Sequence, residues 1–389
     1  MIRLSHSIVA SLLVLASVWL HADPPPAGAG RMLQQLRSES WIQQAEALHY
    51  LGEHRVELAT DPIRSLLNSG TAHPWIRGRA LVSLSQIENK VDPAEFGKWV
   101  AHDLIPLRAA AAEVLESHGA NSAETWIDIL LKDPEPIVKC HAAAAYAKRN
   151  GGGAWPVIDP VTDSPTPAIA QACARALAFT GNEAALARLG RHLSEPDLIR
   201  ESLRGISRIQ NAALIPLLLD LLPDLEETDL NYGAILTALQ NQEWKEVTNG
   251  LAVFIKSEDE NRVRAGARLI TTLTRSPELG PPLREALSKA TRTETIEAGL
   301  IALGSAAMNP DEHHQFFSKT LKHEEPSIRS LSIRCLAHCK DVNHYEVLRE
   351  SLVDEDFEVV QAALAALKRQ PAVNAPQGRL VAYLEAPLS

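Results

Sequence analysis

A short phrase recurs in this chain about every thirty-one residues. Its first four copies begin with an apolar residue at Ile76, Leu107, Val138 and Ile169, at steps of 31 residues. A small residue follows four positions later, and a larger apolar or aromatic residue follows eight positions later. A fixed period between about 20 and 50 residues indicates stacked repeats rather than one globular domain. The repeat therefore constrains the architecture before any other feature does.

The phrase continues almost to the end of the chain. Steps of 30 to 33 residues separate the later copies, which begin at Ile199, Leu230, Val263, Ile296, Ile328 and Val359. Apolar positions at 0, 4 and 7 or 8 trace one stripe of an α-helix, and a second apolar run lies between copies, for example over residues 126–131. No segment alternates with period two between hairpin turns. Each unit therefore predicts helix, turn, helix, and the fold class is all-α.

The predicted turns carry helix-start and helix-stop residues. Pro136, Pro167 and Pro326 stand just before the first apolar residue of their copies, where proline loses no helical hydrogen bond. Gly151 and Gly181 follow predicted helices, where a left-handed residue ends a helix without strain.

One copy shows a family resemblance in full. Residues 133–146 (DPEPIVKCHAAAAY) resemble the HEAT repeat, closest to the short bacterial subtype also found in phycobilisome lyases. The resemblance covers roughly residues 40–370 and implies an α-solenoid superhelix of about ten stacked HEAT-like helical hairpins. In such repeats the basic residue after the first apolar position pairs with a turn acid or a neighbouring repeat. A structural role is thus implied for Arg77, Arg108, Lys139, Arg200, Arg264 and Arg329.

The two ends differ from the repeat array. Residues 1–22 have the layout of a secretory signal peptide, with Arg3 before an apolar stretch and Ala22 at the expected cleavage point. The stretch is shorter than the roughly 20 residues of a membrane span, although an uncleaved anchor is the alternative. We expect a Pro/Gly-rich linker and start of a cap at 23–38, the repeat array at 39–372 and a C-terminal cap at 373–389. The expected location is the periplasm or the extracellular space, with no integral span after cleavage.

The net charge and the absence of known motifs narrow the classes of function that we expect. The formal net charge is −10, which argues against nucleic-acid binding because that needs a basic surface. The chain has no glycine-rich phosphate loop, no Gly-x-Ser-x-Gly elbow and no His-Glu-x-x-His motif. We therefore expect no catalytic activity and no cofactor; lyase activity would follow from the family resemblance alone.

Two clusters are candidate binding sites. An acidic loop could hold calcium, meet a basic partner or remain solvated, and its carboxylates are Asp224, Glu226, Glu227 and Asp229. A second cluster offers sulfur and imidazole ligands suited to zinc or copper(I), and it comprises Cys335, His338, Cys339 and His344. The simpler interpretation places Cys335 in the core. The spacing leaves open whether the chain's cysteines are free, bridged or metal-bound.

The exposed positions of the second helices are the remaining candidates. Positions two, three and six after the first apolar residue are surface candidates, for example Arg79, Glu113, His141 and Arg175. These side chains form no aromatic or single-sign stripe, so they do not specify a partner's chemistry. The sequence favours an exported scaffold that binds a protein partner. The alternative is a cell-envelope enzyme or metal-dependent binding protein that uses the cysteine–histidine cluster.

Overall fold

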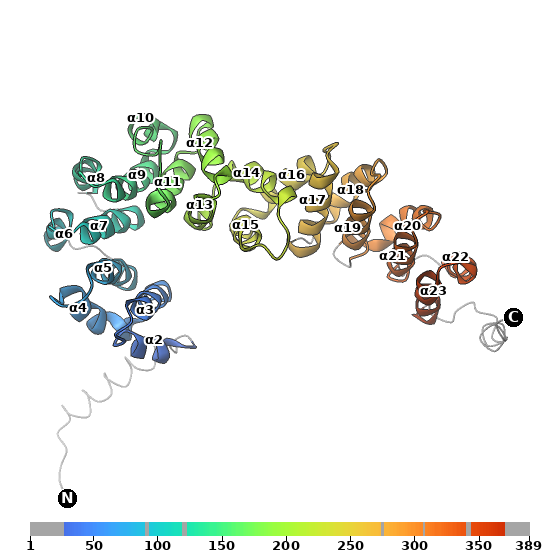
Figure 1. Ribbon diagram of the computed structural model, residues 1–389, viewed down its shortest axis with the longest axis horizontal. Coiled ribbons are helices and arrows are strands. Elements are labelled where there is room, and N and C mark those ends of the chain that lie inside the picture. Colours follow the sequence, from blue (N-terminus) through green and yellow to red (C-terminus); the bar gives the residue numbers. More distant parts are fainter. Residues whose placement is uncertain are drawn as a thin grey trace, which may run out of the picture. The chain divides into compact units, whose positions relative to one another are not determined.

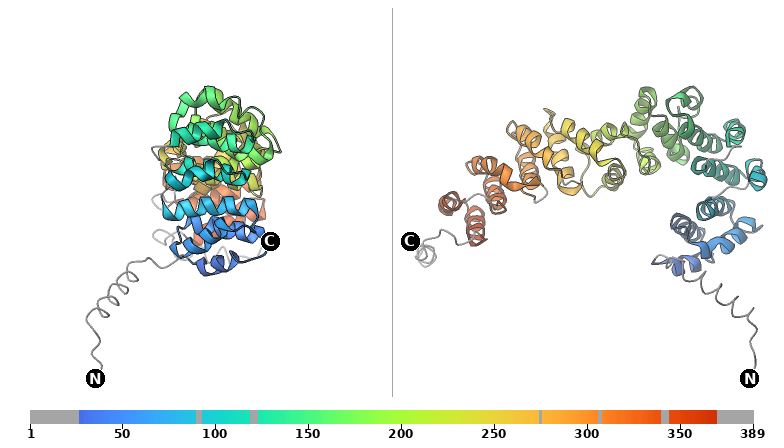
Figure 2. Two further views of the ribbon diagram at one scale, coloured as in Figure 1. Left: turned by 90° about the vertical axis from the view of Figure 1, so that its left-hand side faces the viewer. Right: turned by 180° about the vertical axis from the view of Figure 1, so that it is seen from behind.

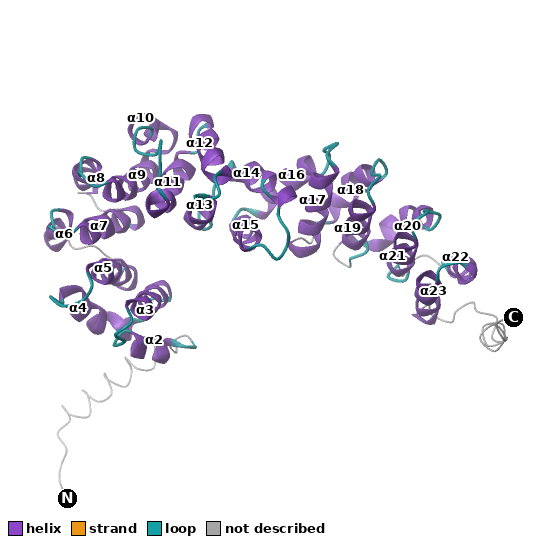
Figure 3. Cartoon of the chain, in the orientation of Figure 1, coloured by secondary structure: helices purple, strands orange, loops and turns teal. Residues whose placement is uncertain are grey.

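The protein is helical throughout the residues that its structure describes. The computed structural model describes residues 27–89, 93–118, 123–273, 276–305, 308–339 and 344–369. Within these ranges no strand occurs, and helices alternate with short turns (Figure 3). The chain divides into two compact units, Met1–His192 and Leu193–Ser389, which are described separately. The all-α prediction is confirmed.

Unit 1 is a succession of helical hairpins (Figure 1). Its α-helices are α2 (Ala29–Gln35), α3 (Trp41–Glu53), α4 (Thr60–Asn68), α5 (Pro74–Glu88), α6 (Pro93–Val100), α7 (Ile105–Ser117), α8 (Ala123–Leu131), α9 (Pro136–Asn150), α10 (Trp155–Ile158), α11 (Pro167–Thr180) and α12 (Glu183–Ser194). The short 3₁₀ helices η1 (Glu57–Ala59) and η2 (Gly151–Ala154) precede α4 and α10. The division between the units falls in the last turn of α12.

Unit 2 continues the same order of elements. Its α-helices are α13 (Ile199–Ile206), α14 (Leu214–Asp220), α15 (Leu230–Gln240), α16 (Trp244–Phe254), α17 (Glu260–Leu273), α18 (Gly280–Leu287), α19 (Thr293–Leu303), α20 (His314–Thr320), α21 (Pro326–Leu336), α22 (Tyr345–Glu350) and α23 (Phe357–Arg369). Its 3₁₀ helices are η3 (Leu222–Asp224), η4 (Pro277–Leu279), η6 (Pro310–His313) and η7 (Ser351–Val353).

All ten copies of the sequence phrase fall on helices, the odd-numbered ones from α5 to α23. Each of these helices is preceded by an even-numbered helix, so the copies correspond to ten hairpins. The first apolar position is buried in most copies, as Ile76 and Val138 show, and the small position is fully buried in Ala80 and Ala142. The predicted α-solenoid arrangement of stacked hairpins is confirmed within each unit, and the described parts of the two units together contain the ten hairpins.

Proline and glycine delimit helices as predicted. Pro136, Pro167 and Pro326 each occupy the first turn of their helix, where their missing N–H costs no internal bond. Gly181 ends α11 with φ 63°, and Gly151 ends α9 with φ 51°, conformations that side-chain-bearing residues seldom adopt. These local signals fix where α9 and α11 begin and end, and where α21 begins.

The sequence phrase predicts the wrong helical register for the copy that begins at Leu230. Leu230 is 77% exposed, so it is not the buried start of its repeat. The buried stripe of α15 consists instead of Tyr232, Ile235, Ala238 and Leu239. Asp229 caps this helix by accepting a hydrogen bond from the Asn231 amide, which makes Leu230 the first helical residue. From that position its side chain faces away from the core.

Second helices pack directly against one another in unit 1. Helices α3, α5, α7, α9 and α11 contact in succession, and Figure 2 shows this order from behind, from blue to green. Small residues allow the approach: residues 109–112 of α7 are four buried alanines. A Cβ on Gly78 would lie only 2.6 Å from the Pro106 carbonyl oxygen of α7. This close packing fixes the order and the spacing of the second helices in unit 1.

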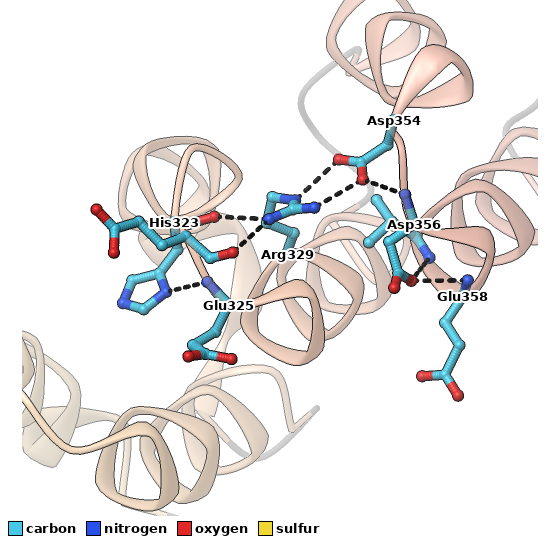
Figure 4. A network of polar contacts seen from close by, with 8 residues as sticks. His323, Glu325, Arg329, Asp354, Asp356 and Glu358 are labelled. Carbon is cyan, nitrogen blue, oxygen red and sulfur yellow. Dashed lines mark hydrogen bonds and ion pairs between the residues drawn. The ribbon is translucent and has the colours of Figure 1, made fainter.

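Two basic residues of the phrase hold neighbouring repeats together. Arg108 of α7 donates from Nε to Asp133 Oδ2 at 2.6 Å, and Asp133 lies in the next turn. Arg329 of α21 donates in the same way to Asp354, 25 residues later, and also to two backbone carbonyls (Figure 4). Arg77 donates to the Leu67 carbonyl instead. These three basic residues have structural partners; the role of Lys139, Arg200 and Arg264 stays a prediction.

The expected terminal segments are not structurally tested. The predicted signal peptide at 1–22 and cap at 373–389 lie outside the described residues, as do the first four residues of the predicted linker at 23–38. Across the described ranges, no helix combines the length and apolar character that crossing a membrane requires.

Candidate protein-binding face

The four predicted surface residues lie on the second helices of four successive hairpins in unit 1. Arg79 is on α5, Glu113 on α7, His141 on α9 and Arg175 on α11. Their contacts form two sets: Arg79 bonds to Glu113, and Arg175 bonds to His141 and to Glu116 of α7. Glu113 and Glu116 are three residues apart on α7, so the two sets are neighbours on that helix. We call these five residues the polar ladder.

Three contacts build the polar ladder. Arg79 Nη1 donates to Glu113 Oε2 at 2.9 Å, which joins α5 to α7. Arg175 Nε donates to Glu116 Oε2 at 3.0 Å, and Arg175 Nη2 donates to His141 Nδ1 at 3.1 Å. Arg175 thus reaches from α11 to both α9 and α7, and Glu116 is 59 residues earlier in the chain.

Exposure decreases along the polar ladder. The Arg79 side chain is 40% exposed and that of Glu113 is 21% exposed, whereas Arg175 and Glu116 are each 12% exposed. The end at α5 is therefore the part most accessible to another molecule. The end at α11 is fixed by its own ion pair and hydrogen bond.

The environment of the polar ladder sets its charges. Burial alone would raise the pKa of Glu113, but the cations Arg79 and Arg175, with His141, outweigh burial and leave that pKa below its usual value. For Glu116 burial dominates, and its pKa is raised although Arg175 opposes the shift. Burial, with Arg175 beside the ring, lowers the pKa of His141 to about 4.

His141 is consequently neutral at physiological pH. Because the arginine guanidinium has only donors, Nδ1 of His141 accepts the hydrogen bond from Arg175, and the ring proton lies on Nε2. A histidine with so low a pKa is a weak base, and no hydroxyl or thiol nucleophile contacts it among the described hydrogen bonds. The arrangement suits hydrogen bonding better than proton transfer.

The acidic loop of unit 2 is largely occupied by local structure. Asp229 caps α15, and Arg268 of α17 approaches Glu227 at 3.5 Å and Glu226 at 3.9 Å. Asp224 is exposed at the end of η3. Among the described residues, no group of three or more metal-binding side chains converges here or elsewhere. The calcium interpretation therefore has no geometry to support it.

The cysteine–histidine cluster is not assembled as a metal site. Cys335 Sγ donates to the Leu300 carbonyl at 3.3 Å, and Cys339 Sγ donates to the Pro310 carbonyl at 3.4 Å. Burial raises the pKa of each thiol to about 12, which disfavours the thiolate that a metal needs. His344 is buried, and His338 lies in the turn after α21. The two thiols therefore bond to separate carbonyls, and the four predicted ligands do not converge on a shared centre among the described residues.

Sequence reasoning did not select two features that the structure brings together. Glu116 follows Glu113 by three residues, so it lies on the same helical face, and that spacing was a usable signal. Cys140 and Cys173 lie at different positions of their repeats, yet their sulfur atoms are 3.1 Å apart. Their meeting depends on how α9 and α11 pack, which the spacing did not reveal.

A family comparison agrees with the fold. The family model described as HEAT repeats matches residues 123–203 and 280–368. These two regions are similar to HEAT repeats. They cover α8 to α13 in part and α18 to α23, and they include the hairpins that carry His141, Arg175 and Arg329. The likeness to the phycobilisome-lyase subtype stays a prediction.

Solved structures that are similar to this chain include karyopherins. Kap121p bound to the extreme C-terminus of the protein phosphatase Cdc14p has a TM-score of 0.43 and 11% identity, over 94% of this chain and 49% of that one. Kap121p bound to Pho4p has a TM-score of 0.44 and 11% identity, over 87% and 45%. The chain spans about half the length of these structures. No curated protein matches it in sequence.

Proposed function

We propose that this protein is an exported HEAT-repeat scaffold that binds a protein partner along the polar ladder of unit 1 and has no catalytic activity. The carrying observation is that polar side chains from four successive repeats form two bonded sets that are neighbours on α7, and that the α5 end of the ladder is open to solvent. Stacked repeats present such extended surfaces, and protein binding is their common use.

The charges of the polar ladder indicate the partner's chemistry. Arg79 and Arg175 carry positive charge, Glu113 carries negative charge, and His141 is neutral. Alternating signs on one face give specificity for a segment of complementary alternating charge rather than for a uniformly charged polymer. The partner we expect is a protein segment with mixed charged and hydrogen-bonding side chains.

A charge swap tests this proposal. In Arg79→Glu/Glu113→Arg the internal ion pair can re-form, while the pattern offered to the partner is reversed. Because the new arginine at 113 lies near Arg175, circular dichroism and urea unfolding verify that this variant is folded before capture. The matched control is Arg64→Glu/Glu88→Arg, an exposed pair between α4 and the end of α5. Partners captured from an extract of the source cells by the wild type should be retained by the control and lost by the ladder swap. Equal capture by both swaps would refute the ladder as the binding face.

Export is a separate part of the proposal. It rests on the apolar stretch before Ala22 and is tested by fractionation and N-terminal sequencing of the protein from its source. A mature chain that begins after Ala22 in the envelope or medium supports export. An intact N-terminus in the cytoplasmic fraction contradicts it.

A further inference from the structure

Two buried cysteines from neighbouring repeats face each other in unit 1. Cys140 is on α9 and Cys173 on α11, and they are 1% and 0% exposed. The Cys173 thiol donates to the Cys140 sulfur at 3.1 Å, and both side chains are in the reduced state. Cys140 also approaches the Val161 carbonyl at 3.8 Å. The pair is isolated from solvent, and the other two cysteines bond to backbone carbonyls within unit 2.

We propose that Cys140 and Cys173 are a redox modification site that forms a disulfide joining α9 to α11. The sulfur atoms are closer than ordinary contact, and a disulfide requires them to approach by a further ångström, to about 2.05 Å. Helices α9 and α11 pack along their lengths, so a small rotation of the two side chains is the main adjustment needed. The helix backbones already hold the two residues opposite each other.

The chemistry requires an oxidant of the disulfide class. One cysteine, as thiolate, attacks a sulfur of an oxidised thiol–disulfide reagent and forms a mixed disulfide, which releases the first reagent thiol. The second cysteine then attacks the protein sulfur of that mixed disulfide and releases the second reagent thiol. Overall the two protein thiols lose two protons and two electrons, and the reagent disulfide gains them. The hydrogen bond to Cys140, together with burial, raises the pKa of Cys173, so exchange is slow while the helices stay packed.

The disulfide would bear directly on the polar ladder. His141 follows Cys140, and Arg175 is two residues after Cys173, so the bond would cross the same helix pair as the Arg175–His141 contact. Oxidation would fix the separation of α9 and α11 at this level, and reduction would leave it to noncovalent packing. The proposal does not depend on the partner-binding proposal, because its readouts are covalent.

Peptide mapping tests the proposal. The reduced full-length protein is incubated with oxidised and reduced glutathione in urea below its unfolding midpoint, alkylated and digested with trypsin. Cleavage after Lys139, Lys148, Arg149 and Arg175 places the two cysteines in separate peptides, residues 140–148 and 150–175. We expect one linked peptide pair, a mass lower by two hydrogens, two remaining free thiols and a higher unfolding midpoint than in the reduced protein.

Two variants make the result decisive. Cys335→Ser should still form the link, whereas Cys173→Ser should form none and should show no change of midpoint on oxidation. Four free thiols after exposure to the oxidant would overturn the proposal. A stable glutathione adduct on Cys140, or a link through Cys335 or Cys339, would overturn it as well.

Discussion

The Arg329–Asp354 pair offers the sharpest test of how repeats are held together. The guanidinium donates to Asp354 at 2.8 and 2.7 Å and to the carbonyls of His323 and Glu324 at 3.0 and 2.7 Å. The side chains of Arg329 and Asp354 are 10% and 15% exposed. Arg329→Ala removes all four hydrogen bonds and leaves the carboxylate and two carbonyls without this partner.

The burial of the Arg329–Asp354 pair determines how much stability the Arg329→Ala variant should lose. Breaking a fully buried ion pair costs roughly 3–5 kcal/mol, and an exposed pair contributes about 0–1 kcal/mol. This pair is mostly buried, but its small exposure lets water reach the groups left behind. We therefore expect Arg329→Ala to lower the free energy of unfolding by about 3 kcal/mol. Arg329→Lys should recover less than half, because lysine cannot form the two-pronged contact.

The pH dependence adds a second check. The hydrogen bond from Arg329 lowers the pKa of Asp354 in the folded state. A carboxyl with a depressed pKa contributes stability above its unfolded value of about 4, and that contribution is lost as pH falls through the folded pKa. The difference between wild type and Arg329→Ala should therefore be largest near neutral pH and should shrink in acid.

Urea unfolding and amide hydrogen exchange measure these effects. Exchange should accelerate in α21 and α23, which the pair joins to the intervening turn, more than in α5 and α7. Arg334→Ala is the matched control, because Arg334 is exposed on the same helix. If Arg329→Ala were no more destabilising than Arg334→Ala, or if its effect did not depend on pH, the structural role of the basic position would be wrong.

Three further predictions follow from other parts of the molecule. Because the pKa of His141 is about 4 in the folded protein and about 6.5 when unfolded, wild-type stability should fall as pH drops between these values, and His141→Asn should show a smaller fall in urea titrations, the remainder coming from histidines such as His192. Gly78→Ala should destabilise by about 1 kcal/mol in the same assay, since overpacking against the Pro106 carbonyl exceeds the gain in helix propensity; a more stable variant would contradict the close approach of α5 and α7. Purified protein should hold no stoichiometric zinc or copper by metal analysis, and Cys339→Ala should leave that content unchanged; a bound equivalent lost in the variant would restore the metal site.

Much of the fold followed from the sequence because burial in a helix stack is periodic. The phrase predicted the second helices and their small positions, such as Ala80 and Ala142, since these residues meet the same environment in each repeat. Leu230 shows the limit: apolar character alone did not reveal that the Asp229 cap starts the helix there and turns Leu230 outward. Capping, rather than the thirty-one-residue period, decides the register of α15.

The candidate site was predictable in part. Helical spacing identified the exposed positions of the second helices, and four of them belong to the polar ladder. Spacing did not reveal that Arg175 passes α9 to reach Glu116, or that Cys140 meets Cys173, because both contacts depend on helix rotation and separation. The alternative of a metal site at the cysteine–histidine cluster fails for a related reason. Cys335 and Cys339 are near in sequence, but buried packing directs each thiol to a different carbonyl.

Site-specific photo-cross-linking tests the central claim most directly. Gln171 is exposed on α11, one helical turn before Arg175, so a photoreactive residue at 171 is placed beside the polar ladder without replacing any of its members. Lys132, exposed in the turn after α8, is the control position. In the source cells we predict a cross-linked protein partner from position 171 and none from position 132. A partner that cross-links equally from both positions, or from 132 alone, would contradict recognition along the polar ladder.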